Sequence, residues 1–231
     1  MISDNGLYLH QAQIGPMDNF VYILADLKTR KCAVVDPAWD VDYFLTHIKA
    51  QNFELEAIFL THGHGDHING VEDILKFKNV PVYLSSKCLY HPPSYAKVHY
   101  TDDIPETDDT VEPSKTDNKK NTYNTVPLGN LELTVIPTPG HSPGGQCFLY
   151  KKTLISGDTV FVNGCGHCRL EGASVSLLYD AIQLIKTLDD DIIIYPGHDY
   201  GPTGTDTIGK QKKTNPYFTN NFAKFTQMRK A

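Results

Sequence analysis

The stretch that decides the fold is Thr61-His62-Gly63-His64-Gly65-Asp66-His67, which follows the apolar run Ala57-Ile58-Phe59-Leu60. Six of its residues, 62–67, carry three imidazoles and one carboxylate, the usual protein ligands of zinc-like metals. Burying such groups without partners would cost on the order of several kcal/mol. A solvated loop is typically built from Ser, Asn and Gly rather than from clustered His. The stretch therefore predicts a metal site at the end of a buried strand.

The composition, with 40% hydrophobic and 21% charged residues, predicts a single soluble domain over residues 1–231. The formal net charge of −6 argues against binding to nucleic acid or to an acidic membrane. We see no signal peptide, and no apolar run approaches the roughly 20 residues of a membrane span. The five cysteines are sparse and odd in number, which favours a reducing compartment. We therefore expect a cytoplasmic protein, whose oligomeric state stays open.

Hydrophobic patterning predicts alternating strands and helices. We expect strands at residues 20–24, 32–35, 57–60, 80–84, 131–136, 146–150, 153–155 and 191–195. We expect helices at residues 40–50, with Asp40 as the N-cap, at 68–77 and at 174–188. This rhythm indicates sheets covered by helices.

Two segments break this rhythm. Residues 85–125 are rich in charge and poor in aliphatics, and we predict a polar surface loop or lid with little regular structure. His91 and His99 within it are expected to be ordinary surface residues. Residues 207–231 are predicted to form a C-terminal extension. Its possible docking contacts are Pro216, Tyr217, Phe218, Phe222 and Phe225.

Further metal ligands follow the ends of other predicted strands. These are His141, Asp158 and His198. Strand ends at one edge of a layered fold lie close together, so scattered residues can converge there. Five imidazoles and two carboxylates are too many for one tetrahedral ion and suit two ions with a carboxylate between them.

The pattern His-x-His-x-Asp-His at residues 62–67, with the later Gly140-His141, Gly157-Asp158 and Gly197-His198, resembles the metallo-β-lactamase fold superfamily. The resemblance covers about residues 7–200 and implies an α/β fold, an αββα sandwich of two mixed sheets with helices outside. It implies two divalent metal ions, with zinc favoured and iron or manganese as alternatives. The implied ligands are His62, His64 and His141 for one ion and Asp66, His67 and His198 for the other, with Asp158 bridging them.

Finer motifs are similar to those of glyoxalase II (hydroxyacylglutathione hydrolase). They are Pro139-Gly140-His141-Ser142-Pro143-Gly144, Ser156-Gly157-Asp158-Thr159-Val160-Phe161, Gly164-Cys165-Gly166, Glu171-Gly172 and Thr214-Asn215-Pro216. Asp158 favours the hydrolase branches, because true zinc β-lactamases commonly place Cys in this region. Tyr195-Pro196-Gly197-His198-Asp199-Tyr200 is also similar to the iron-dependent persulfide dioxygenases.

The resemblance implies two competing activities. The favoured one is hydrolysis of a small-molecule thioester of the S-acyl glutathione type, in which hydroxide held by the metals attacks the carbonyl and Asp66 orients it. The alternative is a persulfide dioxygenase that acts on glutathione persulfide. It would use one Fe(II) ion held by His62, His141 and Asp158, with open positions for persulfide and O₂.

The predicted substrate-binding residues are His167, Cys168 and Arg169, which depart from both family patterns. Arg169 can bind a carboxylate through two hydrogen bonds, or can be a plain surface arginine. Compared with the longer hydrolases that this chain resembles, the C-terminal helices that supply basic glutathione contacts look truncated, and Lys210, Lys212 and Lys213 are candidate substitutes.

Cys165-Gly166-His167-Cys168 also has the C-x-x-C spacing of thiol–disulfide oxidoreductases. No thioredoxin-like βαβ unit surrounds it, which weakens a redox role. A non-catalytic binding protein is disfavoured because every ligand position is filled.

Overall fold

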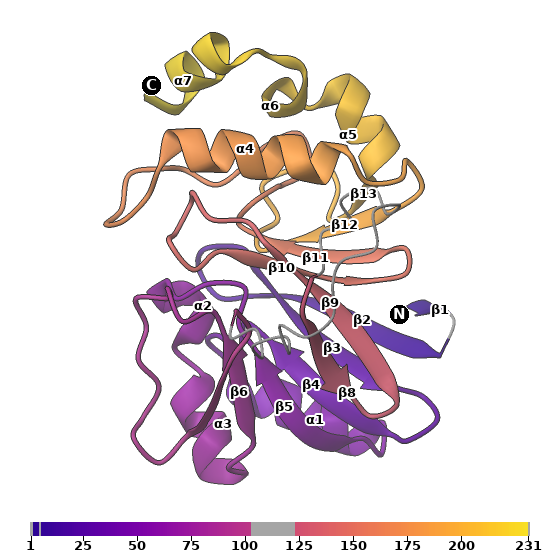
Figure 1. The fold of residues 1–231 in the computed structure, drawn as a ribbon. Helices are drawn as coiled ribbons and strands as arrows, with labels where there is room; N and C mark the ends of the chain where they lie inside the picture. Colours follow the sequence, from indigo (N-terminus) through magenta and orange to yellow (C-terminus); the bar gives the residue numbers. More distant parts are fainter. Residues whose placement is uncertain (1, 5, 103–122, 231) are drawn as a thin grey trace, which may run out of the picture.

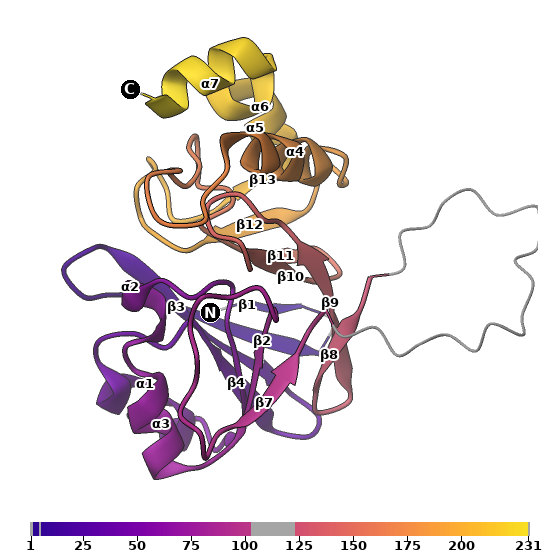
Figure 2. The same ribbon diagram turned by 60° about the vertical axis from the view of Figure 1, so that its left-hand side comes forward.

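The computed structural model describes residues 2–4, 6–102 and 123–230, which form two β-sheets stacked face to face with helices on both outer faces (Figure 1). The predicted αββα sandwich is confirmed. Figure 2, a view turned by 60°, shows the same order of layers, with α1 and α3 on one side and α4–α7 on the other.

The first sheet has seven strands in the order β1-β2-β3-β4-β5-β6-β7. Their bounds are β1 Ile2–Asp4, β2 Leu7–Ile14, β3 Asn19–Asp26, β4 Lys31–Val35, β5 Glu54–Phe59, β6 Pro81–Leu84 and β7 Lys97–Tyr100. Neighbours pair antiparallel from β1 to β4 and parallel from β4 to β7, so the sheet is mixed.

The second sheet has six strands in the order β13-β12-β11-β10-β9-β8. Their bounds are β8 Thr125–Leu128, β9 Leu131–Pro137, β10 Gln146–Tyr150, β11 Thr153–Gly157, β12 Ile193–Pro196 and β13 Asp206–Thr207. Only β11 and β12 pair in parallel, because α4 crosses between them.

Strand β3 shows why the chain needs a layer on each face of the first sheet. All eight of its residues are buried. Val21 and Ile23 point to the helical side, whereas Tyr22 and Leu24 point into the core between the sheets. A strand with apolar groups on both faces is stable only when both faces are covered. The continuous apolar run at 20–24 is the sequence signal of this arrangement.

The helices α1 Val41–Ala50, α2 Gly65–Ile68 and α3 Val71–Phe77 belong to the first sheet's side of the molecule. The predicted N-cap is confirmed, because the Asp40 carboxylate accepts a hydrogen bond of 3.1 Å from the backbone N of Tyr43. The prediction of one helix over 68–77 is wrong, since a break at Asn69-Gly70 separates α2 from α3. Gly70 packs closely against Pro37 and Val41 there.

The second sheet is covered by α4 Val175–Lys186, α5 Ile208–Thr214, α6 Pro216–Thr219 and α7 Phe222–Lys230 (Figure 1). Residues 208–230, within the predicted C-terminal extension, therefore lie in the outer helical layer. Phe218 and Phe225 are buried in the same core as Leu178 and Ile182 of α4.

The prediction of an irregular loop over 85–125 is partly wrong. Residues 97–100 form β7, the edge strand beside β6. Its short length and exposed polar residues hide it in the sequence. The part of the prediction at 103–122 lies outside the described residues. Of the helices that the structure describes, none is long and apolar enough to span a bilayer.

Candidate metal centre

The predicted ligands follow the ends of four strands, one in the first sheet and three in the second. His62, His64, Asp66 and His67 follow β5, His141 follows β9, Asp158 follows β11 and His198 follows β12. The structure brings all seven residues to one place between the two sheets, as expected for strand ends at one edge of a layered fold.

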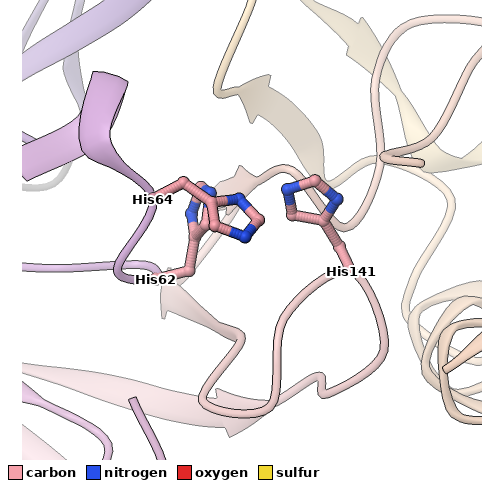
Figure 3. Close-up of side chains that lie close together, drawn as sticks. All are labelled: His62, His64 and His141. Atoms are coloured by element: carbon pink, nitrogen blue, oxygen red, sulfur yellow. The ribbon is translucent and has the colours of Figure 1, made fainter. Parts of the chain in front are cut away.

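The first group consists of His62, His64 and His141, whose ligand nitrogens lie within 4.8 Å of one another. In Figure 3, His62 and His64 project from the loop after β5 and face His141 across a small gap. The ring of His141 lies 5.0 Å from that of His62 and 4.5 Å from that of His64, at 75° and 85°. Rings held this close and nearly perpendicular converge on a point rather than stack.

The second group consists of Asp66, His67 and His198. The Nε2 atoms of His67 and His198 face each other at 3.2 Å, and each lies 3.4 Å from Asp66 Oδ2. Two imidazole nitrogens that face each other at this distance need a proton or a cation between them, because two lone pairs repel.

Asp158 connects the two groups. Its Oδ2 lies 3.3 Å from His141 Nε2 and 3.4 Å from His198 Nε2, while its Oδ1 lies 3.5 Å from His67 Nε2. The carboxylate is almost fully buried. A buried carboxylate placed between two ligand groups has the position of a bridging ligand.

A second observation, buried polar atoms without hydrogen-bond partners among the described residues, also indicates that these residues fit metal ions. Three buried polar atoms in this centre have no hydrogen-bond partner in the described structure: His62 Nε2, His141 Nε2 and Asp158 Oδ1. Most buried polar atoms are hydrogen-bonded, so such orphans need an explanation. A donor set of imidazole nitrogen and carboxylate oxygen suits zinc, iron or manganese.

Hydrogen bonds at Nδ1 orient four of the imidazoles and leave Nε2 free to face the centre. The acceptors are Thr61 Oγ1 for His62 at 3.0 Å, Asp36 Oδ2 for His67 at 3.1 Å, the His167 carbonyl for His141 at 2.7 Å and the Met17 carbonyl for His198 at 2.8 Å. Metal-binding histidines generally have such an outer partner, which fixes the tautomer and the ring orientation.

Asp36 is a site residue that sequence reasoning missed. Its carboxylate accepts hydrogen bonds from Thr61 N at 2.7 Å, Thr61 Oγ1 at 2.5 Å and His67 Nδ1. It has a φ of 51°, in the left-handed region that Asp tolerates better than most residues. An acidic residue directly after β4, followed by Pro37, is the signal that could have found it.

Asn19 and Trp39 were also missed. The Asn19 amide donates to Asp66 Oδ2 at 2.9 Å and to the Asp66 carbonyl at 3.1 Å. Trp39 Nε1 donates to Asn19 Oδ1 at 2.8 Å, which fixes the direction in which the buried amide points. Neither residue type is a usual ligand of zinc, so a search for zinc ligands in the sequence passes over them.

The pKa shifts of several residues in the centre are consistent with a cation-binding site. Burial raises the pKa of Asp66, but hydrogen bonding with His198 and the charge of His67 outweigh it and hold that pKa well below its usual range. Burial lowers the pKa of His198, but Asp158 and Asp66 outweigh it and raise the pKa to about 10. Burial and His141 lower the pKa of His64 to about 4. Without a metal ion, a proton in the second group supplies the positive charge there.

The predicted substrate loop lies beside the first group. The exposed His167 ring lies 5.1 Å from the His141 ring, and Arg169 is exposed. Lys210 and Lys212 instead pair with Asp206 at 3.2 Å and Asp190 at 2.6 Å. His91 and His99 are exposed, and neither belongs to a ligand group among the described residues, as expected for surface histidines.

The thiols of the C-x-x-C sequence give a redox role no support. Burial raises the pKa of Cys165 to about 12 and also raises that of Cys168. Reactive cysteines need a lowered pKa, since the thiolate is the nucleophile. Cys168 Sγ instead donates to the Gly140 carbonyl at 3.5 Å.

Comparisons with known proteins agree with the fold. A sequence profile of the metallo-beta-lactamase superfamily matches residues 14–198. The protein named "probable polyketide biosynthesis zinc-dependent hydrolase PksB", from Bacillus subtilis, is 33% identical over 202 residues, which cover 87% of this chain and 81% of that protein. Its counterpart BaeB from Bacillus velezensis is 31% identical over 201 residues, with the same two coverages of 87% and 81%.

Among solved structures, ETHE1 from Myxococcus xanthus superposes with a TM-score of 0.80 at 25% identity, covering 96% of this chain and 90% of that one. The profile spans most of the chain, and both relatives exceed 30% identity over most of their length. The chain belongs to the metallo-β-lactamase superfamily.

Proposed function

We propose that this protein is a metal-dependent hydrolase that cleaves a thioester, with zinc as the metal and two ions in the site. The observation that carries the proposal is the arrangement of two ligand groups with Asp158 between them. The names of the two Bacillus relatives, both zinc-dependent hydrolases, support the metal and the reaction type. The glyoxalase II-like motifs support a thioester of the S-acyl glutathione type.

The metal, when bound, would lower the pKa of a coordinated water and polarise the thioester carbonyl. The chain's own residues then have defined tasks. Asp66 stays ionised at neutral pH, because its pKa is lowered, and Asn19 holds its carboxylate in one orientation. This carboxylate would accept a hydrogen bond from the attacking water and orient it toward the carbonyl. Water adds to the acyl carbon, the C–S bond breaks, and the products are a carboxylic acid and a thiol.

The exposed residues His167 and Arg169 lie on the side of the first group. We assign to Arg169 the binding of a substrate carboxylate, because its guanidinium can donate two parallel hydrogen bonds. Glutathione carries such carboxylates, whereas a thioester of N-acetylcysteamine has none at its thiol end. Arg169→Gln should therefore raise KM for the glutathione thioester and leave KM for the N-acetylcysteamine thioester unchanged.

The competing activity is a persulfide dioxygenase with a single Fe(II) ion. It uses only His62, His141 and Asp158 as ligands and leaves the other four residues in supporting positions, namely His64, Asp66, His67 and His198. The second group favours two ions over a single Fe(II) ion, because its three ligand atoms lie within 4.8 Å of one another and suit a second ion.

The test combines metal analysis with two assays on the purified protein. We expect two zinc equivalents per chain and thiol release from an S-acyl glutathione, with no O₂ uptake in the presence of glutathione persulfide. Asp158→Asn should abolish thiol release and most metal binding. The matched control is Asp191→Asn, whose carboxylate pairs at the surface with Lys152. Iron content with persulfide-dependent O₂ uptake would overturn the proposal.

A further inference from the structure

We propose that Arg229, together with Asn215, positions the metal ligands His141 and Asp158. These two side chains of the C-terminal helices hold the loop of residues 161–168, here termed the support loop, against both ligands. The inference rests on the metal centre proposed above. It gives residues 215–230, which no ligand motif covers, a task in building that centre.

On its outer side, the support loop is held by hydrogen bonds that two side chains donate to four of its backbone carbonyls. The Asn215 amide donates to the carbonyls of Phe161 at 3.3 Å and Gly164 at 3.0 Å. Arg229 Nη1 donates to the carbonyls of Cys165 at 3.1 Å and Gly166 at 2.9 Å. Four acceptors within six residues are thus taken by two donors that lie about fifty to sixty residues further along the chain.

On its inner side, the support loop contacts the two ligands directly. The backbone N of Gly166 donates to the Asp158 carbonyl at 2.9 Å, and the His167 carbonyl accepts from His141 Nδ1 at 2.7 Å. Gly166 fits so closely that a Cβ atom there would lie 2.2 Å from the Asp158 carbonyl oxygen and 2.7 Å from His141 Nδ1. A displacement of this loop therefore moves the His141 ring and the backbone of Asp158.

Arg229 is itself fixed to the helical layer. Its guanidinium lies over the Tyr217 ring, 4.2 Å from the centroid, and its Nη2 donates to the Tyr217 hydroxyl. Helix α7 is anchored by the buried Phe225, whose ring lies 5.3 Å from that of Tyr179 on α4 and 5.7 Å from that of Tyr217. The hydrogen bonds to the support loop thus start from a packed helix rather than from a free chain end.

A simpler role for Arg229 would be to stabilise helix α7 alone. The two roles differ in what they do to the metal centre. A stabilising residue changes the free energy of unfolding and leaves metal affinity in the folded protein unchanged. A positioning residue changes the affinity and the ligand field, because outer partners of metal ligands typically contribute about 10–100-fold in metal affinity.

The experiment titrates the metal-free protein with Co(II) and follows the visible absorption bands, with a chelator as competitor. Arg229→Gln should lower Co(II) affinity by about 10–100-fold and shift the bands of the site that contains His141. The matched control is Lys224→Gln, which removes a positive charge from an exposed position of the same helix and should leave both unchanged. Thermal melting of each variant establishes that it is folded.

If Arg229→Gln does not fold, Arg229→Lys takes its place. Lys keeps the charge and most of the stem but reaches one carbonyl instead of two, so we expect a smaller loss in the same direction. A folded Arg229 variant with wild-type affinity and spectrum would overturn the inference. A wild-type protein that binds no Co(II) would overturn both the inference and the proposed function. A wild-type protein that binds Co(II) but releases no thiol would overturn the proposed function alone.

Discussion

At the scale of single residues, the centre depends on groups outside the predicted ligand set. Asp36 satisfies three donors at once and thereby fixes Thr61 and His67, two neighbours of the ligand stretch. Thr61 in turn accepts from His62 Nδ1, because its own hydroxyl proton is given to Asp36. One buried carboxylate therefore sets the orientation of a histidine in each ligand group.

Asp36→Asn preserves the shape of this side chain and removes one of its two accepting oxygens. We expect a loss of about 1–3 kcal/mol in the free energy of unfolding, because a buried donor is left without an acceptor. We also expect metal affinity to fall by about 10–100-fold. Urea unfolding of the metal-free protein and a chelator competition measure the two effects. Wild-type values in both would show that the hydrogen bonds of Asp36 are unimportant.

His198 makes metal binding dependent on pH. Its pKa is raised from 6.5 to about 10 by Asp158 and Asp66, so the metal-free protein carries a proton there at neutral pH. The stabilisation from this proton is fully present below about pH 6.5, the unfolded value, and is lost as the pH rises through about 10. A metal ion at Nε2 must displace the proton.

We therefore expect zinc binding at pH 8 to release protons and to tighten with rising pH, by about tenfold per pH unit for each proton released. Calorimetry in two buffers of different ionisation enthalpy counts these protons. A heat of binding that is the same in both buffers would contradict the assignment.

At the scale of elements, the end of β11 lies close against the segment that follows β5. Gly157 has a φ of 48°, and a Cβ atom there would lie 2.5 Å from the Thr61 hydroxyl. Only glycine allows this backbone conformation and this approach together, so the end of β11 can place Asp158 beside the loop that follows β5.

Gly157→Ala should lower both stability and metal affinity, because it adds a collision with Thr61 to the strain of a left-handed backbone. Gly6→Ala is the matched control, since Gly6 also has a positive φ, 92°, but has nothing within 4 Å of the added atom. We expect about 1 kcal/mol for the control and clearly more for Gly157→Ala. Thermal melting of both variants checks this, and equal losses would mean that the contact with Thr61 is harmless.

The elements also show where patterns in the sequence are insufficient. The spacing of Ile68, Val71, Ile74 and Leu75 is helical throughout. The helix is nevertheless interrupted at Gly70, because that glycine packs on Pro37 and Val41. Strand β7 has too few apolar residues to stand out. Among the described strands, β7 pairs only with β6. It is recognised as a strand by these backbone hydrogen bonds rather than by the pattern of its side chains.

At the scale of the whole molecule, four of the seven proposed ligands lie in one short segment, residues 62–67, and three come from the second half of the chain. Metal binding should therefore hold the two sheets together at this edge. Zinc at about 1,000 times its Kd would add about 4 kcal/mol of stability. For a protein of this size we expect chelation to lower Tm by about 8–16 °C. Calorimetric scans with and without chelator test this, and an unchanged Tm would contradict a metal site that spans the sheets.

The sequence by itself determined the local features. Three histidines and an aspartate within six residues are joined covalently, so no fold is needed to bring them near one another. The alternation of apolar runs predicted sheets covered by helices, because strands with two apolar faces must be covered on both. The αββα sandwich itself was implied by the resemblance to the metallo-β-lactamase superfamily. The Gly-His and Gly-Asp pairs after later strands predicted where the remaining ligands would be found.

Only the tertiary structure decided how these ligands are held. The hydrogen bonds that His67 donates to Asp36, Asn19 to Asp66 and Arg229 to the support loop join residues that are 31, 47 and 63 or more positions apart. No short pattern in the sequence marks such partners, because their residue types are common and their separation depends on strand order and helix packing. Candidate ligands could thus be proposed from the sequence, whereas the orientation of these side chains is a property of the folded chain.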